Sequence, residues 1–116
     1  MSQNNVAIAE AFYAAMANKD LATLAEYLHP DVYFRSPFVQ SSNAAGYLEA
    51  ARKFVAFFTS LTVRNKIASD NQVVVIYDIG FPAPIGNIPT AAWLTFNEGL
   101  VTKIELFFDT NTFRSR

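Results

Sequence analysis

The stretch Thr90–Asp109, TAAWLTFNEGLVTKIELFFD, is predicted to form a β-hairpin, and the rest of the chain is organised around it. Two runs rich in β-forming residues flank Asn97-Glu98-Gly99. A three-residue loop that ends in Gly suits a tight turn, because Gly accepts a positive φ without a Cβ clash. Pairing across this loop places Phe96 opposite Leu100. Opposed residues lie on the same face of a sheet, so the two faces of the hairpin can be read separately.

The two predicted faces differ in character. The first is almost wholly apolar and is expected to cover the core. The second carries large apolar residues among charged ones, so neither face is expected to be free in water. The first face holds Ala92, Leu94, Phe96, Leu100, Ile104, Leu106 and Phe108. The second face holds Trp93, Thr95, Val101, Lys103, Glu105 and Phe107.

Length and composition indicate a single domain over residues 1–116, long enough to bury a core. The apolar fraction is 52 % and the chain has eleven Phe, which predicts an aromatic core, pocket or interface. The formal charge is -1 with scattered Lys and Arg, which disfavours a nucleic-acid partner. The absence of Cys excludes disulfides and thiolate catalysis.

Targeting and cofactor signals are also absent from the sequence. The N-terminal residues lack a basic region followed by a long apolar run, and no apolar segment reaches membrane-spanning length. We therefore expect a soluble cytoplasmic protein without a membrane partner. One His and dispersed acids predict no metal site, and no phosphate-binding loop is present, so no cofactor is expected.

The remaining elements follow from periodicity, caps and breakers. Apolar residues at helical spacing predict helices, and Asp20 is a candidate N-cap for the second of them. Helices first and a strand meander later indicate an α+β fold with the helices on one face of an antiparallel sheet. The predicted helices are 4–18, a short one after Asp20, and 44–61, and the strands before the hairpin are 32–36, 62–68 and 72–81.

Two segments resemble a known family. AFYAAMANKDLATLAEYLHPDVYFRSP, residues 11–37, is similar to the opening of SnoaL-like, or nuclear transport factor two-like, domains, and GLVTKIELFFDTNTF, residues 99–113, is similar to their last strand. The resemblance implies a conical α+β barrel, in which three N-terminal helices pack on a strongly curved mixed or antiparallel sheet around an apolar pocket. The family includes ketosteroid isomerases, polyketide cyclases, limonene epoxide hydrolases, dehydratases and non-enzymatic binding domains, so the fold alone does not give the function.

The catalytic positions of these relatives carry no acid–base group in this chain. The isomerase Tyr falls on Phe12, its base falls on Ser36, and its protonated Asp falls on Ala92. The Asp on the last strand of cyclases and epoxide hydrolases falls on Leu106. The resemblance therefore argues against ketosteroid isomerase or limonene epoxide hydrolase activity.

Two functional hypotheses remain for the pocket. The first is a binding protein for a lipid-like, aromatic or terpenoid small molecule. The second is an enzyme of the isomerase, cyclase or dehydratase type that uses Asp78 or Ser36 with a Tyr hydroxyl such as that of Tyr13. Strand alternation offers the alternative that Asp78 turns outward, opposite Tyr77. The predicted pocket residues are Phe12, Met16, Phe34, Ser36, Phe54, Phe58, Ala92, Leu94 and Leu106.

A third hypothesis is that the mixed face of the hairpin joins two copies. Apolar residues on that face would form an exposed patch in a monomer, and a twofold contact would bury it. The resemblance agrees, since relatives often form dimers through this face. The alternative is that the tail around Phe113 folds back over part of the patch. The predicted interface residues are Trp93, Val101, Lys103, Glu105 and Phe107.

Overall fold

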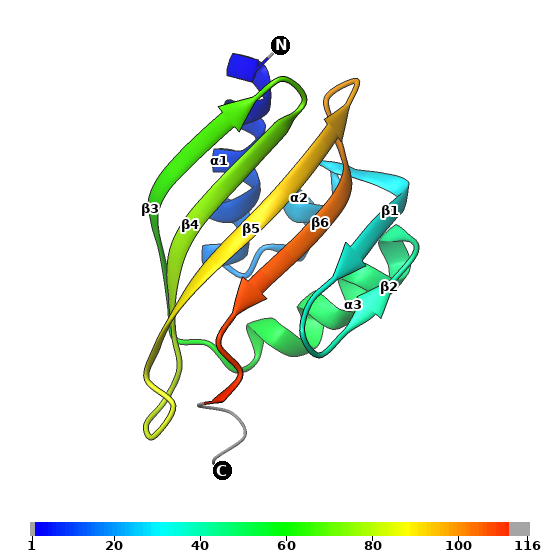
Figure 1. Cartoon of the computed structure of the whole chain (residues 1–116). Coiled ribbons are helices and arrows are strands. Elements are labelled where there is room, and N and C mark those ends of the chain that lie inside the picture. The colour runs from blue at the N-terminus through cyan, green and yellow to red at the C-terminus, as the bar shows by residue number, and fades with distance from the viewer. Residues whose placement is uncertain (1, 112–116) are drawn as a thin grey trace.

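The computed structural model describes residues 2–111. Within them, three helices pack on a six-stranded mixed sheet (Figure 1). The elements in chain order are α1 (Ser2–Ala17), α2 (Leu21–Ala25), β1 (Leu28–Arg35), β2 (Gln40–Ser41), α3 (Ala44–Val55), β3 (Ser60–Ser69), β4 (Gln72–Gly80), β5 (Asn87–Asn97) and β6 (Leu100–Phe108).

The strands are arranged in the order β2-β1-β6-β5-β4-β3. β1 runs parallel to β6 and every other neighbouring pair is antiparallel, so the sheet is mixed. The sheet curves and all the helices lie behind it in the view of Figure 1. The predicted α+β class is confirmed, and so is the cone fold. The sheet is curved and open, however, rather than a closed barrel.

Strict alternation along β4 and β5 defines the inner face of the sheet. Every second residue of β4 from Val73 to Ile79 is buried, and so is every second residue of β5 from Ile88 to Phe96. This period of two is expected of strands that cover a core on one side only. The helices α1 and α3 pack against that inner face, and the opposite, outer face of the sheet carries the alternate residues.

The register of the hairpin corrects the sequence prediction. Asn97 pairs with Leu100, so the loop has two residues, Glu98 and Gly99, both with positive φ. The register then shifts between Thr95 and Phe96, which leaves one extra residue in β6. Such a β-bulge reverses the faces of the residues between it and the turn.

The bulge changes which residue of β6 is buried in the core next to the turn. Phe96 pairs with Val101, and Val101 is 0 % exposed. The prediction of Val101 at an interface on the outer face was therefore wrong. Leu100, which was predicted on the apolar face, instead pairs with exposed Asn97.

The helix boundaries follow their caps. Asp20 caps α2 as predicted, since its side chain accepts a hydrogen bond from the Thr23 amide. Asn43 caps α3 by accepting from the Gly46 amide at 2.7 Å. α3 ends at Val55, six residues before the predicted boundary of 61, because the chain leaves the helix to pair as β3. No helix within residues 2–111 is both long and apolar enough to cross a membrane.

The hairpin turn supplies a stability test. Glu98 has φ 51° and Gly99 has φ 79°, a geometry that favours Asn-Gly in two-residue turns. Glu98→Asn is expected to raise the free energy of unfolding by about 0.5–1 kcal/mol, because Asn tolerates the left-handed region better than Glu. Urea unfolding measures the change.

Gly99→Ala is the matched opposite variant. A Cβ at this position would lie 4.0 Å from the nearest atom, the Ile8 Cδ1, so only backbone strain is introduced. We expect the free energy of unfolding to fall by about 1 kcal/mol. A Glu98→Asn variant less stable than wild type would contradict the turn geometry.

Candidate ligand cavity

A cavity of about 540 Å³ lies between α3 and the inner face of the sheet. Its volume is within the range of roughly 300–1,000 Å³ that small-molecule sites occupy. α1 and α3 supply one wall, with Met16, Ala51 and Phe54 among its residues. β4, β5 and β6 supply the other wall, which includes Ile79 and Leu106.

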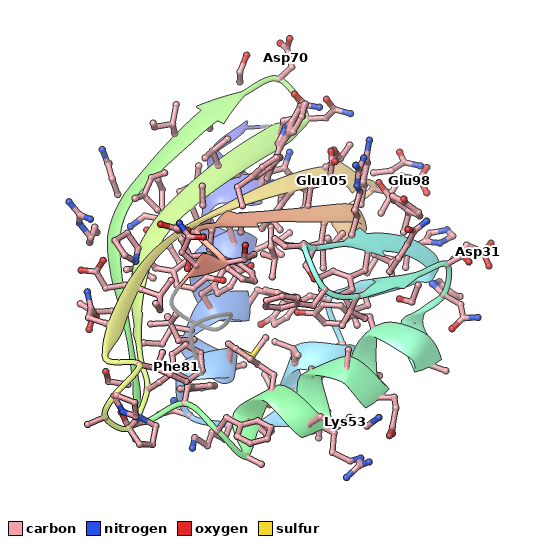
Figure 2. All side chains as sticks on the ribbon, turned by 60° about the horizontal axis from the view of Figure 1, so that its bottom comes forward. Asp31, Lys53, Asp70, Phe81, Glu98 and Glu105 are labelled. Atoms are coloured by element: carbon pink, nitrogen blue, oxygen red, sulfur yellow. The ribbon has the colours of Figure 1, made fainter. Side chains whose placement is uncertain are left out.

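The cavity has a buried end and an open end. The open end is formed by the exposed Phe38 and Phe57, of which Phe57 is 66 % exposed, and by the β4–β5 connection from Phe81 to Ile85. Figure 2 places Phe81 at this end of the sheet, on the same side as α3, and shows Lys53 on the far side of that helix. The buried end is formed by tyrosines.

Among residues 2–111, no charged side chain lines the cavity. The walls that these residues form are apolar apart from five hydroxyl groups, which belong to Tyr13, Ser36, Tyr47, Tyr77 and Thr90. The described part of the chain supplies no carboxylate, imidazole or amine there to act as a proton-transfer group near neutral pH. Within residues 2–111, no group of three or more His, Cys, Asp or Glu side chains could hold a metal ion.

Three elements bring the tyrosines together. Tyr13 comes from α1, Tyr47 from α3 and Tyr77 from β4. The rings of Tyr13 and Tyr77 lie 5.0 Å apart, and Phe12 packs against both Tyr13 and Tyr47 with centroid distances of 5.2 and 6.2 Å. Phe34 meets the Tyr47 ring edge-on at 4.9 Å. Such aromatic contacts stabilise the rings in fixed orientations.

Burial keeps the three phenols protonated. Desolvation raises the pKa of Tyr13, Tyr47 and Tyr77 well above the usual value of 10.0, because an anion would be unfavourable in this apolar region. The nearby Tyr77 side chain raises the pKa of Tyr13 further, whereas the Tyr13 side chain counteracts part of the rise at Tyr77.

Two of the three candidate catalytic residues do not present a usable group to the cavity. Ser36 lines it, but its Oγ donates to the Val39 carbonyl at 3.2 Å and accepts from the Val39 amide at 3.0 Å, which closes a local turn. Asp78 points to the outer face, where it pairs with Arg64 at 3.4 Å, and it does not line the cavity. The alternation that buries Tyr77 places Asp78 outside. Of the three, Tyr13 alone offers a buried hydroxyl group.

The predicted pocket residues divide into two groups. Those that line the cavity are Met16, Phe34, Ser36, Phe54 and Leu106. Those that do not line it, and lie buried in the core instead, are Phe12, Phe58, Ala92 and Leu94.

The difference has a simple cause on β5. The cavity takes Ile88 and Thr90, at the start of this strand, whereas Ala92 and Leu94 lie further toward the hairpin turn. The pocket residues predicted from the sequence also did not include Tyr47 and Tyr77, which line the cavity. For Tyr77 a signal existed, because alternation in VVVIYDI places it on the same face as Val73 and Val75. For Tyr47 the direction of the side chain was not readable from spacing.

Comparison with known proteins gives the family and the fold. A family model described as a SnoaL-like domain matches residues 9–104. No curated protein matches the chain.

Several solved structures have the same fold at low identity. TerC, co-crystallised with polyporic acid, has a TM-score of 0.83 and 22 % identity, over 97 % of this chain and 96 % of that one. An NTF2-like protein of unknown function from Cytophaga hutchinsonii has a TM-score of 0.84 and 18 % identity, over 95 % and 94 %. A steroid delta-isomerase from Pseudomonas aeruginosa has a TM-score of 0.78 and 21 % identity, over 91 % and 80 %. These similarities establish the fold and leave the activity open.

The buried phenols predict a loss of stability at alkaline pH. Their pKa values are raised in the folded state. The stability that the neutral phenols give the fold is therefore fully present below pH 10.0, the usual pKa of a Tyr in the unfolded chain. As pH rises above 10, the unfolded chain loses protons that the folded chain keeps, and the free energy of unfolding falls by at most about 1.4 kcal/mol per pH unit for each phenol. Urea unfolding between pH 8 and pH 11 measures this slope.

Variants identify the groups responsible. Tyr13→Phe with Tyr77→Phe is expected to flatten the slope above pH 10, because two of the three titrating groups are removed. Tyr33→Phe is the control, since Tyr33 does not line the cavity. An unchanged slope in the folded double variant would show that these phenols do not control alkaline stability.

Proposed function

The chain belongs to the SnoaL-like domain family, and on that premise we propose that it binds one neutral, apolar small molecule in the cavity between α3 and the sheet. The observation that carries the proposal is that no residue between 2 and 111 contributes a charged side chain to the cavity lining. A charged ligand would lose its hydration there without gaining a partner, which is strongly unfavourable. An apolar ligand loses little favourable hydration when it enters the cavity, and it gains contact with the apolar walls.

The same observation favours binding over acid–base catalysis. Proton transfer at neutral pH needs a group whose pKa lies near the working pH, usually a carboxylate or an imidazole. The lining that residues 2–111 form has neither, and the raised pKa values of Tyr13, Tyr47 and Tyr77 keep these phenols protonated at neutral pH, so they do not act as bases. Asp78, the acid that the sequence analysis named as a catalytic candidate, is paired with Arg64 on the other side of the sheet.

The wall chemistry supports a lipid-like, aromatic or terpenoid ligand. Rings and branched aliphatic groups line the cavity from the buried tyrosines to the rim, with Phe34, Phe54 and Ile79 among them. Aromatic walls accept flat rings and branched hydrocarbons alike through dispersion and edge contacts. TerC, which has the same fold, was co-crystallised with polyporic acid, and that pairing of this fold with a small organic molecule supports the proposal.

Nile red, a neutral apolar dye, tests the proposal. We expect wild-type protein to bind one dye per chain with enhanced fluorescence. Ala51→Trp is expected to abolish this enhancement, because Ala51 lines the cavity and an indole would fill it. Ala45→Trp is the control, since Ala45 is exposed on the same helix and does not line the cavity.

Circular dichroism establishes that both variants are folded before the dye is added. If folded Ala51→Trp bound Nile red as well as wild type does, the dye would lie elsewhere and the proposed site would be refuted. Failure of the wild type to bind any dye would refute the proposal as well.

We also infer that two copies associate through the outer face of the sheet. Ile67, Trp93 and Phe107 are 56 %, 38 % and 52 % exposed on this face. Val74 pairs with both Ile67 and Trp93, so apolar side chains continue across β3, β4 and β5. An apolar patch that spans several strands is unusual on a monomer and is what a twofold contact buries.

Charged groups at one edge of this patch are already ordered within one chain. Glu105 is only 14 % exposed in its side chain and lies 3.5 Å from Lys103 and 3.9 Å from Arg35. Lys103 also lies over the Trp93 ring at 5.9 Å. Ordered charges beside an apolar centre favour a specific register over indiscriminate association. Phe113, which the sequence analysis named as an alternative cover for part of the patch, lies outside the described residues.

Gel filtration with light scattering measures the oligomeric state. Wild type is expected to be a dimer at micromolar concentration, and Trp93→Lys with Phe107→Lys is expected to be monomeric, because two cations would be buried at the contact. Phe57→Lys is the control, since Phe57 is more exposed but lies at the cavity rim. A monomeric wild type would contradict the inference.

A further inference from the structure

Three turns surround the open end of the cavity, and none of them carries a charged residue. We call them together the rim, and they are residues 36–39 between β1 and β2, 56–59 between α3 and β3, and 81–86 between β4 and β5. The longer segments that contain these turns are also free of Asp, Glu, Lys, Arg and His, and they are 36–48, 54–63 and 79–97. Figure 1 shows the β4–β5 connection and the segment between α3 and β3 at the same end of the molecule.

The rim presents apolar side chains to water. Phe57 is 66 % exposed and Val39 is 42 % exposed, and the β4–β5 connection adds the exposed Pro82, Ala83 and Pro84. The apolar character of the cavity explains the side chains that face inward, but it does not require apolar side chains that extend into solvent. An exposed apolar patch around the mouth of a cavity therefore indicates a contact with something outside the chain.

The backbone of the rim forms its hydrogen bonds within the chain. Pro82 and Pro84 have no amide proton, and several other rim amides donate to nearby carbonyl groups. These bonds run from Ser36 to Val39 at 2.8 Å, from Phe57 to Phe54 at 2.9 Å, from Phe81 to Gly86 at 3.0 Å and from Ile85 to Pro82 at 3.2 Å. An amide without a partner is unfavourable away from water, so turns of this kind can enter the boundary between lipid headgroups and acyl chains.

The polar side chains of the rim are also bonded within the chain. Ser36 Oγ donates to the Val39 carbonyl, and Thr59 Oγ1 donates to the Gly80 carbonyl at 3.2 Å. A protein partner needs groups that can form hydrogen bonds across the interface, at roughly one bond per 100–200 Å². A lipid surface has no such requirement, so the rim fits a bilayer better than it fits another protein.

Two cations lie beside the rim on α3. Arg52 and Lys53 are exposed in the last turn of this helix, and they share the carboxylate of Glu49 at distances of 2.6 and 4.0 Å. Two cations with one carboxylate leave one net positive charge there, which favours anionic lipid. Asp109 is an exposed acid directly after β6, so apolar contact is expected to contribute more to docking than charge does.

We propose that the rim docks on the surface of a lipid bilayer that contains anionic lipid, so that the open end of the cavity faces the acyl chains. This inference goes beyond the proposed ligand binding, because it names the surface from which an apolar ligand enters. A neutral apolar molecule partitions into a bilayer and would pass into the cavity without crossing water. The sequence analysis expected no membrane partner because no apolar segment reaches spanning length, but a contact at the bilayer surface needs no such segment.

Two proteins with one tryptophan each test which surface meets the lipid. Wild type has Trp93 on the outer face of the sheet, and Trp93→Phe with Phe57→Trp moves the only tryptophan to the rim. The vesicles contain equal parts of phosphatidylcholine and phosphatidylserine, with a nitroxide label near the headgroup end of the acyl chains. We expect the rim tryptophan to shift its emission to the blue and to be quenched by the label, and we expect the emission of Trp93 to stay unchanged.

A charge at the rim is expected to prevent docking. Phe57→Asp is expected to weaken sedimentation with unlabelled vesicles of the same lipids by about tenfold or more, because a carboxylate would have to leave water. Ala45→Asp is the control, since it adds the same charge at an exposed position of α3 that does not line the cavity. Circular dichroism establishes that both variants are folded.

The cations of α3 are tested by comparison with pure phosphatidylcholine vesicles. Wild type is expected to bind the mixed vesicles about fivefold more tightly, the effect of one net cation near an anionic surface. Arg52→Gln with Lys53→Gln is expected to lose this preference and to keep its affinity for pure phosphatidylcholine. Arg64→Gln with Lys66→Gln is the control, because it changes the net charge equally on β3, at positions that do not line the cavity.

The outcomes separate docking from ligand binding. Wild type that binds no vesicles, quenching of Trp93 in place of the rim tryptophan, or full binding by folded Phe57→Asp would overturn docking. Equal affinity of wild type for both kinds of vesicle would overturn the role of anionic lipid. A lower mass of Phe57→Asp than of wild type in light scattering would also overturn docking, because the rim would then join two copies. Nile red binding without vesicles is measured in parallel: dye binding without docking refutes only the docking, and docking without dye binding refutes only the ligand site.

Discussion

The alternation of side chains along β4 and β5 is the constraint on which the rest of this structure depends. It places Tyr77 inside and Asp78 outside on one strand, and Ala92 inside and Trp93 outside on the next. A slip of one residue would exchange these faces and put a carboxylate into the cavity. The curved sheet encloses the cavity on one side and leaves an apolar patch on the other, so both proposed surfaces of the molecule have the same origin.

Neutral hydroxyl groups are the form of polarity that such a cavity tolerates. An unpaired carboxylate at the position of Tyr77 would be buried among rings with no cation near it, and burial would raise its pKa or destabilise the fold. A phenol places a donor in the same region with most of its surface apolar. The chain thus places hydroxyl groups at the buried end of the cavity and avoids a buried charge there. This arrangement fits a site that binds a ligand rather than one that transfers protons.

Periodicity and family resemblance predicted much of the fold. The α+β class, the cap at Asp20 and the apolar face of β5 follow from local rules, and they hold because packing agrees with local preference at these positions. The bulge near Thr95 was not predicted, and neither was the placement of Val101 that follows from it. A bulge depends on how two strands twist against each other, and a single sequence does not record that.

The candidate site was predicted less completely than the fold. Met16, Phe34 and Leu106 were predicted in the cavity lining, and they line it. On β5 the prediction placed the cavity at Ala92, which lies too far toward the hairpin turn. The direction of Tyr47 depends on how α3 rotates against the sheet, which spacing alone does not determine. The phenol cluster is formed by side chains from α1, α3 and β4, which are distant in sequence, so no local sequence pattern predicts it.

A crystal structure of the protein grown with Nile red tests the central claim most directly. We predict electron density for one dye molecule per chain in the cavity between α3 and β4, in contact with Phe54. An empty cavity with the dye bound only on the outer face of the sheet would contradict this prediction.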